Sequence, residues 1–188
     1  MKKYLFLLFI IIPFLSGCEK IQELTKVDFP FSQSVTIPPI PIVGIPLTIS
    51  TPDMEANVDS ILNAYNLETK NIDGVTLKNL KLTLSAPSDG DLSFIDDIEV
   101  YISASGLDKV KIASAENVGD VSTLDLKVVN ANLKEYLLKD KFSLQFKAAA
   151  DEPTVVEYKI KIDMTVTFDL KIRSEEHTSE LQSRLFIS

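Results

Sequence analysis

The sequence predicts an all-β fold: an antiparallel β-sandwich, immunoglobulin-like or jelly-roll-like, with one or two short helices. Apolar and polar residues alternate in several stretches after Val75, and a period of two is typical of strands that bury one face. Polar turn sequences such as PSDGD separate these stretches. The stretches do not alternate regularly with long helices, which argues against a parallel α/β arrangement. We therefore expect seven or eight strands in two packed sheets.

The longest predicted strand runs from Val156 to Ile172. Every even-numbered residue in it is apolar, and every odd-numbered residue is charged or a threonine. The even-numbered side chains are therefore expected to face the core. Because this stretch is longer than a usual strand, we expect it to bend between the two sheets or to change its partner. The alternation stops at Arg173.

The preceding strands follow the same pattern with one interruption. In VTLKNLKLTLSA, residues 75–86, Leu80 and Leu82 share a face, whereas Leu77 is out of phase. This shift predicts a β-bulge near Lys78 and Asn79. The other predicted strands are residues 98–104, 108–114, 122–129 and 142–149.

Residues 29–53 carry six prolines among isoleucines and valines. Proline has no N–H to donate to a neighbouring strand, so we expect edge strands or extended backbone packed around the sheet. A helix is predicted over residues 51–66, with Thr51 as its N-cap and Pro52 in the first turn. A second short helix is predicted over residues 130–140. The side chains expected to pack on the sheets are Met54, Val58, Ile61, Leu62 and Tyr65 of the first helix, and Leu133, Tyr136 and Leu137 of the second.

The composition excludes several classes of function. The chain has a formal net charge of −8, which disfavours binding to nucleic acid and to anionic lipid headgroups. Before Arg173 it has no histidine, arginine or tryptophan. It therefore lacks the usual neutral-pH base, the imidazole metal ligand and the bidentate anion clamp. We expect no catalytic activity and no cofactor.

One loop carries four carboxylates and is a weak candidate for a cation site. Asp89, Asp91, Asp96 and Asp97 lie in SAPSDGDLSFIDD, and calcium favours clustered carboxylate oxygens. The remaining ligand positions of a calcium loop are wrong, so an ordinary Asp-Gly turn is the favoured interpretation and no metal is expected. Tyr101, predicted to face outward, is interpreted as a surface aromatic paired across strands rather than as a ligand platform.

The first residues, MKKYLFLLFIIIPFLSGCEK, have the three parts of an export signal. Lys2 and Lys3 precede a short apolar run, which ends in Leu-Ser-Gly-Cys at Cys18. This ending resembles the lipobox of bacterial lipoproteins. The resemblance implies that the thiol of Cys18 receives a diacylglyceryl group, that cleavage occurs before it, and that the new amino group is acylated.

The resemblance places the mature chain on a membrane, because several acyl chains hold a protein there stably. Glu19 rather than aspartate follows the cysteine, so the expected location is the outer membrane, lipid-anchored through Cys18. The chain as a whole resembles the small envelope lipoproteins of Gram-negative bacteria. The expected organisation is a signal peptide (1–17), a tether (18–29), one sandwich domain (30–172) and a foreign tail (173–188).

The tail prediction rests on a second resemblance. RSEEHTSELQS, from Arg173 to Ser183, is similar at every position to the translation of a common short-read sequencing adapter. It also holds the chain's only histidine, and both of the chain's arginines lie in residues 173–188. We therefore exclude residues 173–188 from functional reasoning, as a sequence not native to the protein.

The expected function is that of a non-catalytic binding or structural module of the cell envelope, with a protein or a glycan as ligand. The alternative is a periplasmic accessory subunit of an envelope assembly or secretion complex, and an enzyme ranks third. An exposed apolar patch favours a protein partner. A deep pocket with convergent carboxylates of perturbed pKa favours an enzyme.

Overall fold

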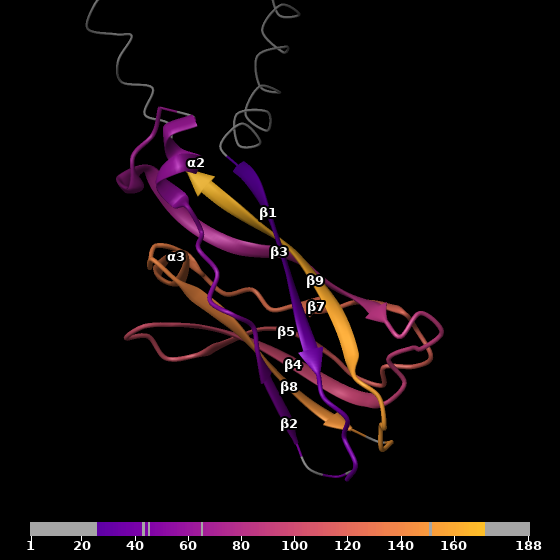
Figure 1. Ribbon diagram of the computed structural model, residues 1–188. Helices are drawn as coiled ribbons and strands as arrows, with labels where there is room; N and C mark the ends of the chain where they lie inside the picture. Colours follow the sequence, from indigo (N-terminus) through magenta and orange to yellow (C-terminus); the bar gives the residue numbers. More distant parts are fainter. Residues whose placement is uncertain (1–25, 43, 45, 65, 151, 172–188) are drawn as a thin grey trace, which may run out of the picture.

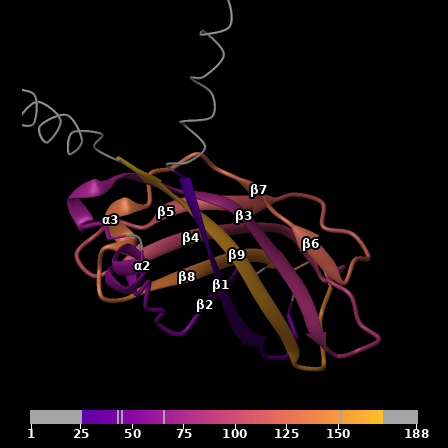
Figure 2. The same cartoon turned by 90° about the horizontal axis from the view of Figure 1, so that it is seen from above.

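The computed structural model describes residues 26–171, apart from residues 43, 45, 65 and 151. They form two antiparallel sheets packed face to face, so the predicted β-sandwich is confirmed (Figure 1). Figure 2 looks through one sheet onto the other, and the strands of the two layers cross at an angle. Predicted residue Ile172 lies outside the described residues, as do the predicted signal peptide and tail.

The four-stranded sheet has the order β1-β9-β3-β6, and the five-stranded sheet has the order β2-β8-β4-β5-β7. All neighbouring strands in both sheets are antiparallel. The strands are β1 (Lys26–Ile37), β2 (Leu47–Ser50), β3 (Ile72–Ala86), β4 (Ile95–Ala104), β5 (Val110–Ala115), β6 (Thr123–Asp125), β7 (Lys127–Val128), β8 (Phe142–Ala150) and β9 (Tyr158–Leu170).

The strands pair in a nested order from the two ends of the chain inward. Strand β1 pairs with β9, β2 with β8, β3 with β6, and β4 with β5. This is the pairing of one long antiparallel hairpin wrapped around a core, which is the arrangement of a jelly roll. Of the two predicted alternatives, the strand pairing therefore selects the jelly roll.

The last strand, β9, lies inside the four-stranded sheet with a partner on each side. It pairs with β1 from Tyr158 to Asp169 and with β3 from Lys159 to Leu170. Its even-numbered residues from 160 to 170 are buried, as predicted. The expected bend or change of partner is wrong, because both neighbours follow β9 along its whole length. Val156, expected in the core, precedes the strand and is 46% exposed.

The chain changes sheets at residues 122–129 instead. This segment, predicted as one strand, forms β6 in the four-stranded sheet and β7 in the five-stranded sheet. Leu126 lies between them, is buried, and donates its N–H to the carbonyl of Leu80 at 2.9 Å. A buried leucine bonded to β3 thus holds the point at which the chain crosses.

The register of β3 against β9 shifts between Leu77 and Asn79. This confirms the predicted bulge near Lys78 and Asn79. The bulge allows Leu77 and Leu80, which are out of phase in the sequence, both to be buried.

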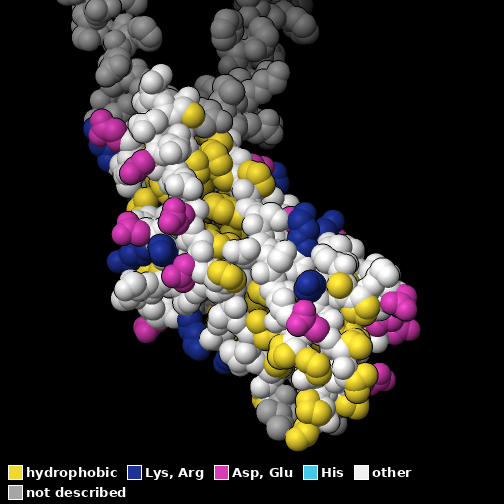
Figure 3. Space-filling model, viewed as in Figure 1, with side chains coloured by type: hydrophobic (Ala, Val, Ile, Leu, Met, Phe, Trp, Pro, Cys, Tyr) yellow, Lys and Arg dark blue, Asp and Glu magenta, His cyan; other side chains and the backbone are white. Residues whose placement is uncertain are grey.

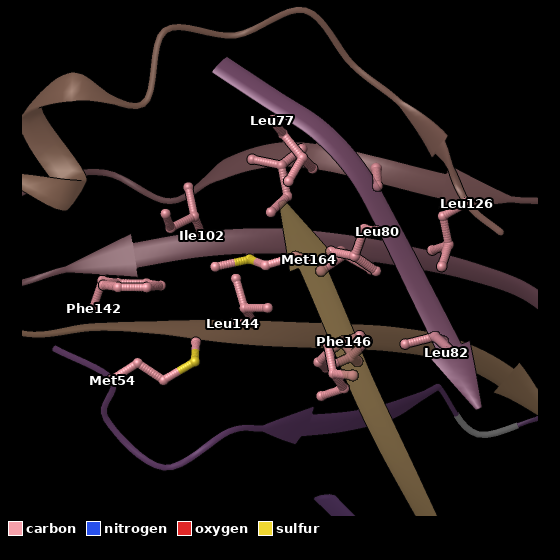
Figure 4. Packing of buried hydrophobic residues seen from close by; sticks show 14 of the residues in the cluster. Met54, Leu77, Leu80, Leu82, Ile102, Leu126, Phe142, Leu144, Phe146 and Met164 are labelled. Carbon is pink, nitrogen blue, oxygen red and sulfur yellow. The ribbon is translucent and has the colours of Figure 1, made fainter. Parts of the chain in front are cut away.

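Apolar side chains from both sheets meet in one core. Figure 4 shows Met164 of β9 between Leu80 of β3 and Leu144 of β8, with Phe142 beside them. Phe142 is almost fully buried, and it meets Phe31 of β1 edge to face, with ring centroids 5.7 Å apart. The core therefore joins β1, at one end of the chain, to β8 and β9 at the other.

The proline-rich region follows the prediction, but its boundary differs. Both β1, which contains Pro30, and β2 are edge strands, as expected for a region rich in proline. The predicted tether of residues 18–29 is corrected, since β1 begins at Lys26. Residues 26–29 belong to the sheet because Val27 and Phe29 pack against the core.

The first helix begins later than predicted. Thr51 is not an N-cap: its backbone N–H donates to the Leu144 carbonyl, and its hydroxyl accepts the Leu144 N–H, both at 2.9 Å. Met54 then forms a bridge with Phe142. These bonds to β8 keep the backbone extended, so helix α2 spans only Val58–Ala64. Its packing is as expected in part: Met54, Val58 and Leu62 are buried, Ile61 is partly buried, and Tyr65 lies outside the described residues.

The second helix is confirmed in a shorter form. Helix α3 spans Lys134–Leu137, and a 3-10 turn, η2, spans Thr69–Asn71. The three side chains expected to pack beside α3 are all buried: Leu133, Tyr136 and Leu137. Within the described residues, none of the helices has the length and apolar character needed to cross a membrane.

The sandwich has two distinct ends. Lys26 is paired with Asp169, so the two ends of the described chain lie together at what we call the terminal end. Ile37 is paired with Tyr158 at the opposite end. We call this the loop end, because the connections β1–β2, β3–β4, β5–β6 and β8–β9 lie there (Figure 1).

A substitution at Phe168 tests how much the buried apolar residues of β9 contribute to stability. Its side chain is 0% exposed, and its ring contacts Phe29 edge to face at 5.3 Å. Phe168→Ala should lower the free energy of unfolding in urea by about 3–5 kcal/mol, because it leaves a cavity between the sheets. The control, Lys159→Ala at an exposed position of the same strand, should change it by less than about 0.5 kcal/mol. Equal stability of the two variants would contradict the central role of β9.

Candidate functional site

The structure places the acidic loop at the loop end and gives two of its carboxylates local partners. Asp91 accepts the backbone N–H of Ser93 at 3.0 Å, and Asp97 accepts that of Asn117 at 3.3 Å. Hydrogen bonding from Ser93, its side chain first and its backbone second, lowers the pKa of Asp91. These are bonds within and between turns, in agreement with the favoured turn interpretation.

The remaining two aspartates, Asp89 and Asp96, lie in the same loop. The backbone carbonyl of Asp96 accepts the N–H of Val118 at 2.9 Å, which ties the loop to the β5–β6 connection. Asp89 lies two residues before Asp91, in the turn that follows β3. Within residues 26–171, with the gaps given above, no group of three or more histidine, cysteine, aspartate or glutamate side chains could hold a metal ion.

Cys18, the predicted lipidation site, lies outside the described residues. The segment between it and the sheet is short, since β1 begins at Lys26. Residues 19–25 span at most about 25 Å when fully extended.

The most distinctive surface is an apolar one at the loop end. Ile42 is 61% exposed, Val155 is 88% exposed and Val156 is 46% exposed. Val121, in the β5–β6 connection, is exposed at the same end. Figure 3 shows hydrophobic side chains gathered at this end of the molecule. Four of the six exposed large hydrophobic residues in the described chain thus share one end, and we call these four the apolar end.

Two hydrogen bonds hold the loops of the apolar end together. The Ile40 carbonyl accepts the Thr154 N–H at 2.8 Å, and the Thr154 hydroxyl accepts the Ile40 N–H at 3.0 Å. Both residues are buried, with Thr154 6% and Ile40 9% exposed. Because these buried bonds fix the backbone at Ile40 and Thr154, the exposed side chains of Ile42 and Val155 extend from two loops that are held together.

A small slot lies between the two sheets on the side of the sandwich where β1 and β2 are the edge strands. Its internal volume is about 20 Å³, room for roughly one water-sized group. It is far smaller than a site for a drug-sized ligand, which needs about 300 Å³ or more. The lining is entirely apolar: Val35, Ile37, Leu47, Ile49, Leu82, Ile95, Ile98, Phe146, Ala148, Ile160 and Ile162.

The outer face of the five-stranded sheet carries a polar cluster around Tyr101. The Tyr101 hydroxyl donates to one Glu99 oxygen at 2.7 Å, and the Lys111 ammonium donates to the other at 3.1 Å. The Lys147 ammonium lies 5.2 Å from the centre of the Tyr101 ring. Tyr101 thus faces outward and is paired across strands, as predicted.

These contacts shift the pKa values of the cluster. The hydrogen bond from Tyr101, and next that from Lys111, lowers the pKa of Glu99. The same contacts raise the pKa of Tyr101 and that of Lys111. All three groups are therefore held more firmly in their usual neutral-pH charge states, which is the opposite of what a proton-transferring residue needs.

Polar side chains on the outer face of the four-stranded sheet also pair with one another. Asp28 is bonded to Lys78 and accepts the Thr167 hydroxyl at 2.6 Å. Asp163 contacts Lys161 at 2.9 Å and accepts the Ser32 hydroxyl at 2.8 Å. The lysine bond, followed by the hydroxyl bond, lowers the pKa of each carboxyl. These surface groups have their partners within the sheet.

Sequence reasoning misses the apolar end. The alternation of β9 extends to Val156 and predicts a core position for it, and the proline content predicts a β1–β2 connection packed on the sheet. The available signal is the turn Asp151-Glu152-Pro153, since a strand beginning just after a turn often leaves its first residues outside the ladder. Val156 has the even parity of the core residues that follow it, whereas Val155 precedes the predicted strand.

Comparison with known proteins gives matches among solved structures alone. No protein-family model and no curated protein sequence matches it. Among solved structures, turnip yellow mosaic virus matches with 15% identity and a TM-score of 0.34, over 81% of this chain and 85% of that one. Desmodium yellow mottle tymovirus matches with 14% identity and a TM-score of 0.28, over 80% and 91%. Scores this low carry no argument, so the jelly-roll assignment rests on the strand pairing alone.

The Glu99 cluster predicts the direction of two pKa changes. Tyr101→Phe and Lys111→Met should each raise the pKa of Glu99, because each variant removes a hydrogen bond that lowers it. The stabilisation from Glu99 is present above its unfolded pKa and is lost as the pH falls through its lower folded pKa. Carbon-13 titration of the Glu99 carboxyl in each variant measures the shift. The same pKa in the wild type and both variants would refute the assigned contacts.

Proposed function

We propose that this chain is a lipid-anchored, non-catalytic lipoprotein that acts as a binding or structural module of the cell envelope. The observation that carries the proposal is the apolar end, formed by Ile42, Val121, Val155 and Val156. Grouped exposed aliphatic side chains mark a surface that another molecule covers. The surface consists of aliphatic groups without an aromatic ring among them, so a protein is favoured over a glycan as its ligand.

The anchor of the proposed module is Cys18, in the outer membrane. The lipobox supports this proposal, as does the position of the first strand. Lys26 lies at the terminal end, paired with Asp169, whereas the apolar end lies at the other end of the strands. A lipid at Cys18 therefore leaves the apolar end accessible to a partner.

The alternative is a periplasmic accessory subunit of an envelope assembly or secretion complex. Both proposals use the same apolar end, and they differ in the side of the outer membrane on which it lies. Protease treatment of intact cells separates them. Cleavage while a periplasmic control protein survives supports surface exposure, and protection until the outer membrane is opened supports the accessory subunit.

An enzyme remains third. A general acid working near neutral pH needs a carboxyl with a raised pKa in a closed site. The described carboxyls with a resolved shift all have lowered pKa values and lie on the surface: Asp28, Asp91, Glu99 and Asp163. The apolar slot supplies no polar group for catalysis.

The anchor predicts the behaviour of Cys18→Ser. This variant should move from the membrane pellet to the soluble fraction and should lose incorporation of labelled palmitate, because serine offers no thiol for the thioether. The control is Ser16→Ala, which keeps a small side chain two positions before the cysteine and should stay in the membrane. A Cys18→Ser protein that remains membrane-bound would overturn the anchor.

The apolar end predicts where a partner is captured. A photo-reactive amino acid placed at Val155 should yield a discrete cross-linked product in cells. The same group at Leu138, an exposed residue beside α3 at the terminal end, should not. Ile42→Asp should abolish the Val155 product, because a charge in a covered apolar contact is costly. Equal labelling from Val155 and Leu138 would refute the assignment.

A further inference from the structure

The two sheets present four edge strands, of which one is much longer than the others. Strands β2, β6 and β7 have four, three and two residues, whereas β1 has twelve. The free side of an edge strand carries unpaired N–H and C=O groups that can pair with another strand. Among the strands of the described residues, β1 is therefore the long template for such pairing.

Two observations show which groups of β1 point away from β9. Pro30 has no N–H, so it suits a position whose nitrogen faces outward. The Ser34 N–H donates to the Gln33 side-chain oxygen at 3.0 Å, a local acceptor rather than a group of β9. Residues of one parity face the same side of an antiparallel ladder, so Ser32, Ser34 and Thr36 present their N–H and C=O groups at the free edge.

The free edge is protected over its first half only. Lys26 and Asp28 are charged and Pro30 lacks a donor, and these are the devices by which proteins prevent edge pairing. From Phe31 to Ile37 the strand has no charged residue and no proline, and Pro38 follows it. The unprotected segment thus lies between two prolines, with Ser34 at its centre.

An apolar seam runs beside the unprotected segment. Val35 and Ile37 of β1, together with Leu47 and Ile49 of β2, line the slot on the open side of the sandwich. Leu47 and Ile49 are only partly buried. Figure 3 shows hydrophobic side chains along this side of the molecule. A strand added to β1 would therefore also cover apolar surface.

We propose that two copies of this chain pair through the free edges of β1, antiparallel, with Ser34 opposite Ser34 of the partner subunit. In this register Ser32 lies opposite Thr36 of the partner subunit, and uncharged side chains face one another throughout. Pro30 lies opposite Pro38 of the partner subunit, so pairing ends where neither residue can donate. The interface is self-complementary, as a two-fold dimer requires.

A second copy fits this edge better than the other possible occupants. An acyl chain or a peptide anchored by large side chains would need a pocket, and the slot holds only about 20 Å³. Edge pairing needs no deep pocket, because its hydrogen bonds come from the backbone. The two-fold axis of antiparallel pairing is perpendicular to the sheet, so the terminal ends of the two copies lie at opposite ends of the paired strands. The pairing is independent of the partner proposed for the apolar end.

The register is tested by a single cysteine. In the full chain carrying Cys18→Ser, Ser34→Cys should form a disulfide-linked dimer under mild oxidation. Hydrogen-bonded antiparallel residues have Cα atoms about 5.5 Å apart, which is within the range of a disulfide. Ser32→Cys is the matched control: the two cysteines would lie about 14 Å apart, four residues along the strands, and should not cross-link. Cross-linking of both variants alike, or of neither, would overturn the register.

Equilibrium sedimentation tests the dimer without a cross-link. The Cys18→Ser chain should sediment as a dimer, and adding Ser34→Pro should weaken the dimer about tenfold or more, because two symmetric backbone bonds are lost. The β1–β9 ladder should survive, as it does at Pro30, and an unchanged urea midpoint checks this. If Ser34→Pro does not fold, Ser34→Lys places like charges on the axis. A monomeric parent chain, or a dimer unaffected by either variant, would overturn the proposal.

Discussion

The structure depends on the pairing of β9 with strands on both of its sides. One face of β9 is a continuous apolar row, and its two edges need hydrogen-bonding partners along thirteen residues. Strand β3 supplies one edge, and β1, from the other end of the chain, supplies the second. The pairing of Lys26 with Asp169 therefore joins the ends of the fold, and the nested jelly-roll order follows from it. A fold completed by such distant contacts is expected to form slowly compared with helical proteins of similar size.

Local sequence pattern predicted those features that depend on local geometry. Alternation with a period of two identified the strands, and the phase error at Leu77 identified the bulge, since both follow from which side chains share a face. The pattern could not predict partners. Thr51 has the sequence of a helix cap, but the backbone of Leu144 offers its hydroxyl a bond in an extended conformation. Residues 122–129 have the pattern of one strand, but Leu126 is bonded to β3 where the chain crosses between sheets.

The candidate sites also divide into features that depend on local sequence and features that depend on distant partners. The turn interpretation of the acidic loop depended only on the preference of aspartate and glycine for turns. The hydrogen bond from the Ser93 N–H to the Asp91 carboxylate agrees with it. The exposure of Val156 could not be predicted, because Val156 continues the alternation of the core residues of β9. Thr154, just before Val155, is bonded to Ile40, a residue more than a hundred positions away, and a partner so distant cannot be read from the local pattern. The Ser34 edge likewise depended on knowing that, among the described strands, β1 has a neighbour on one side only.

The hydrogen bonds already made on the outer faces of the sandwich favour binding at the free edge of β1 and at the apolar end. On the outer faces, Asp28, Glu99 and Asp163 already have cationic and hydroxyl partners, so a ligand there would have to replace existing bonds. Such exposed pairs contribute little to stability, but they leave few groups in need of a partner. The free edge and the apolar end differ from these paired carboxylates. A partner that bonds to the backbone of Ser32 and Thr36, or that covers the side chains of Ile42 and Val155, displaces only water. Because these carboxylates of the outer faces are already paired, the ends of the strands and the free edge of β1 are the favoured places for binding.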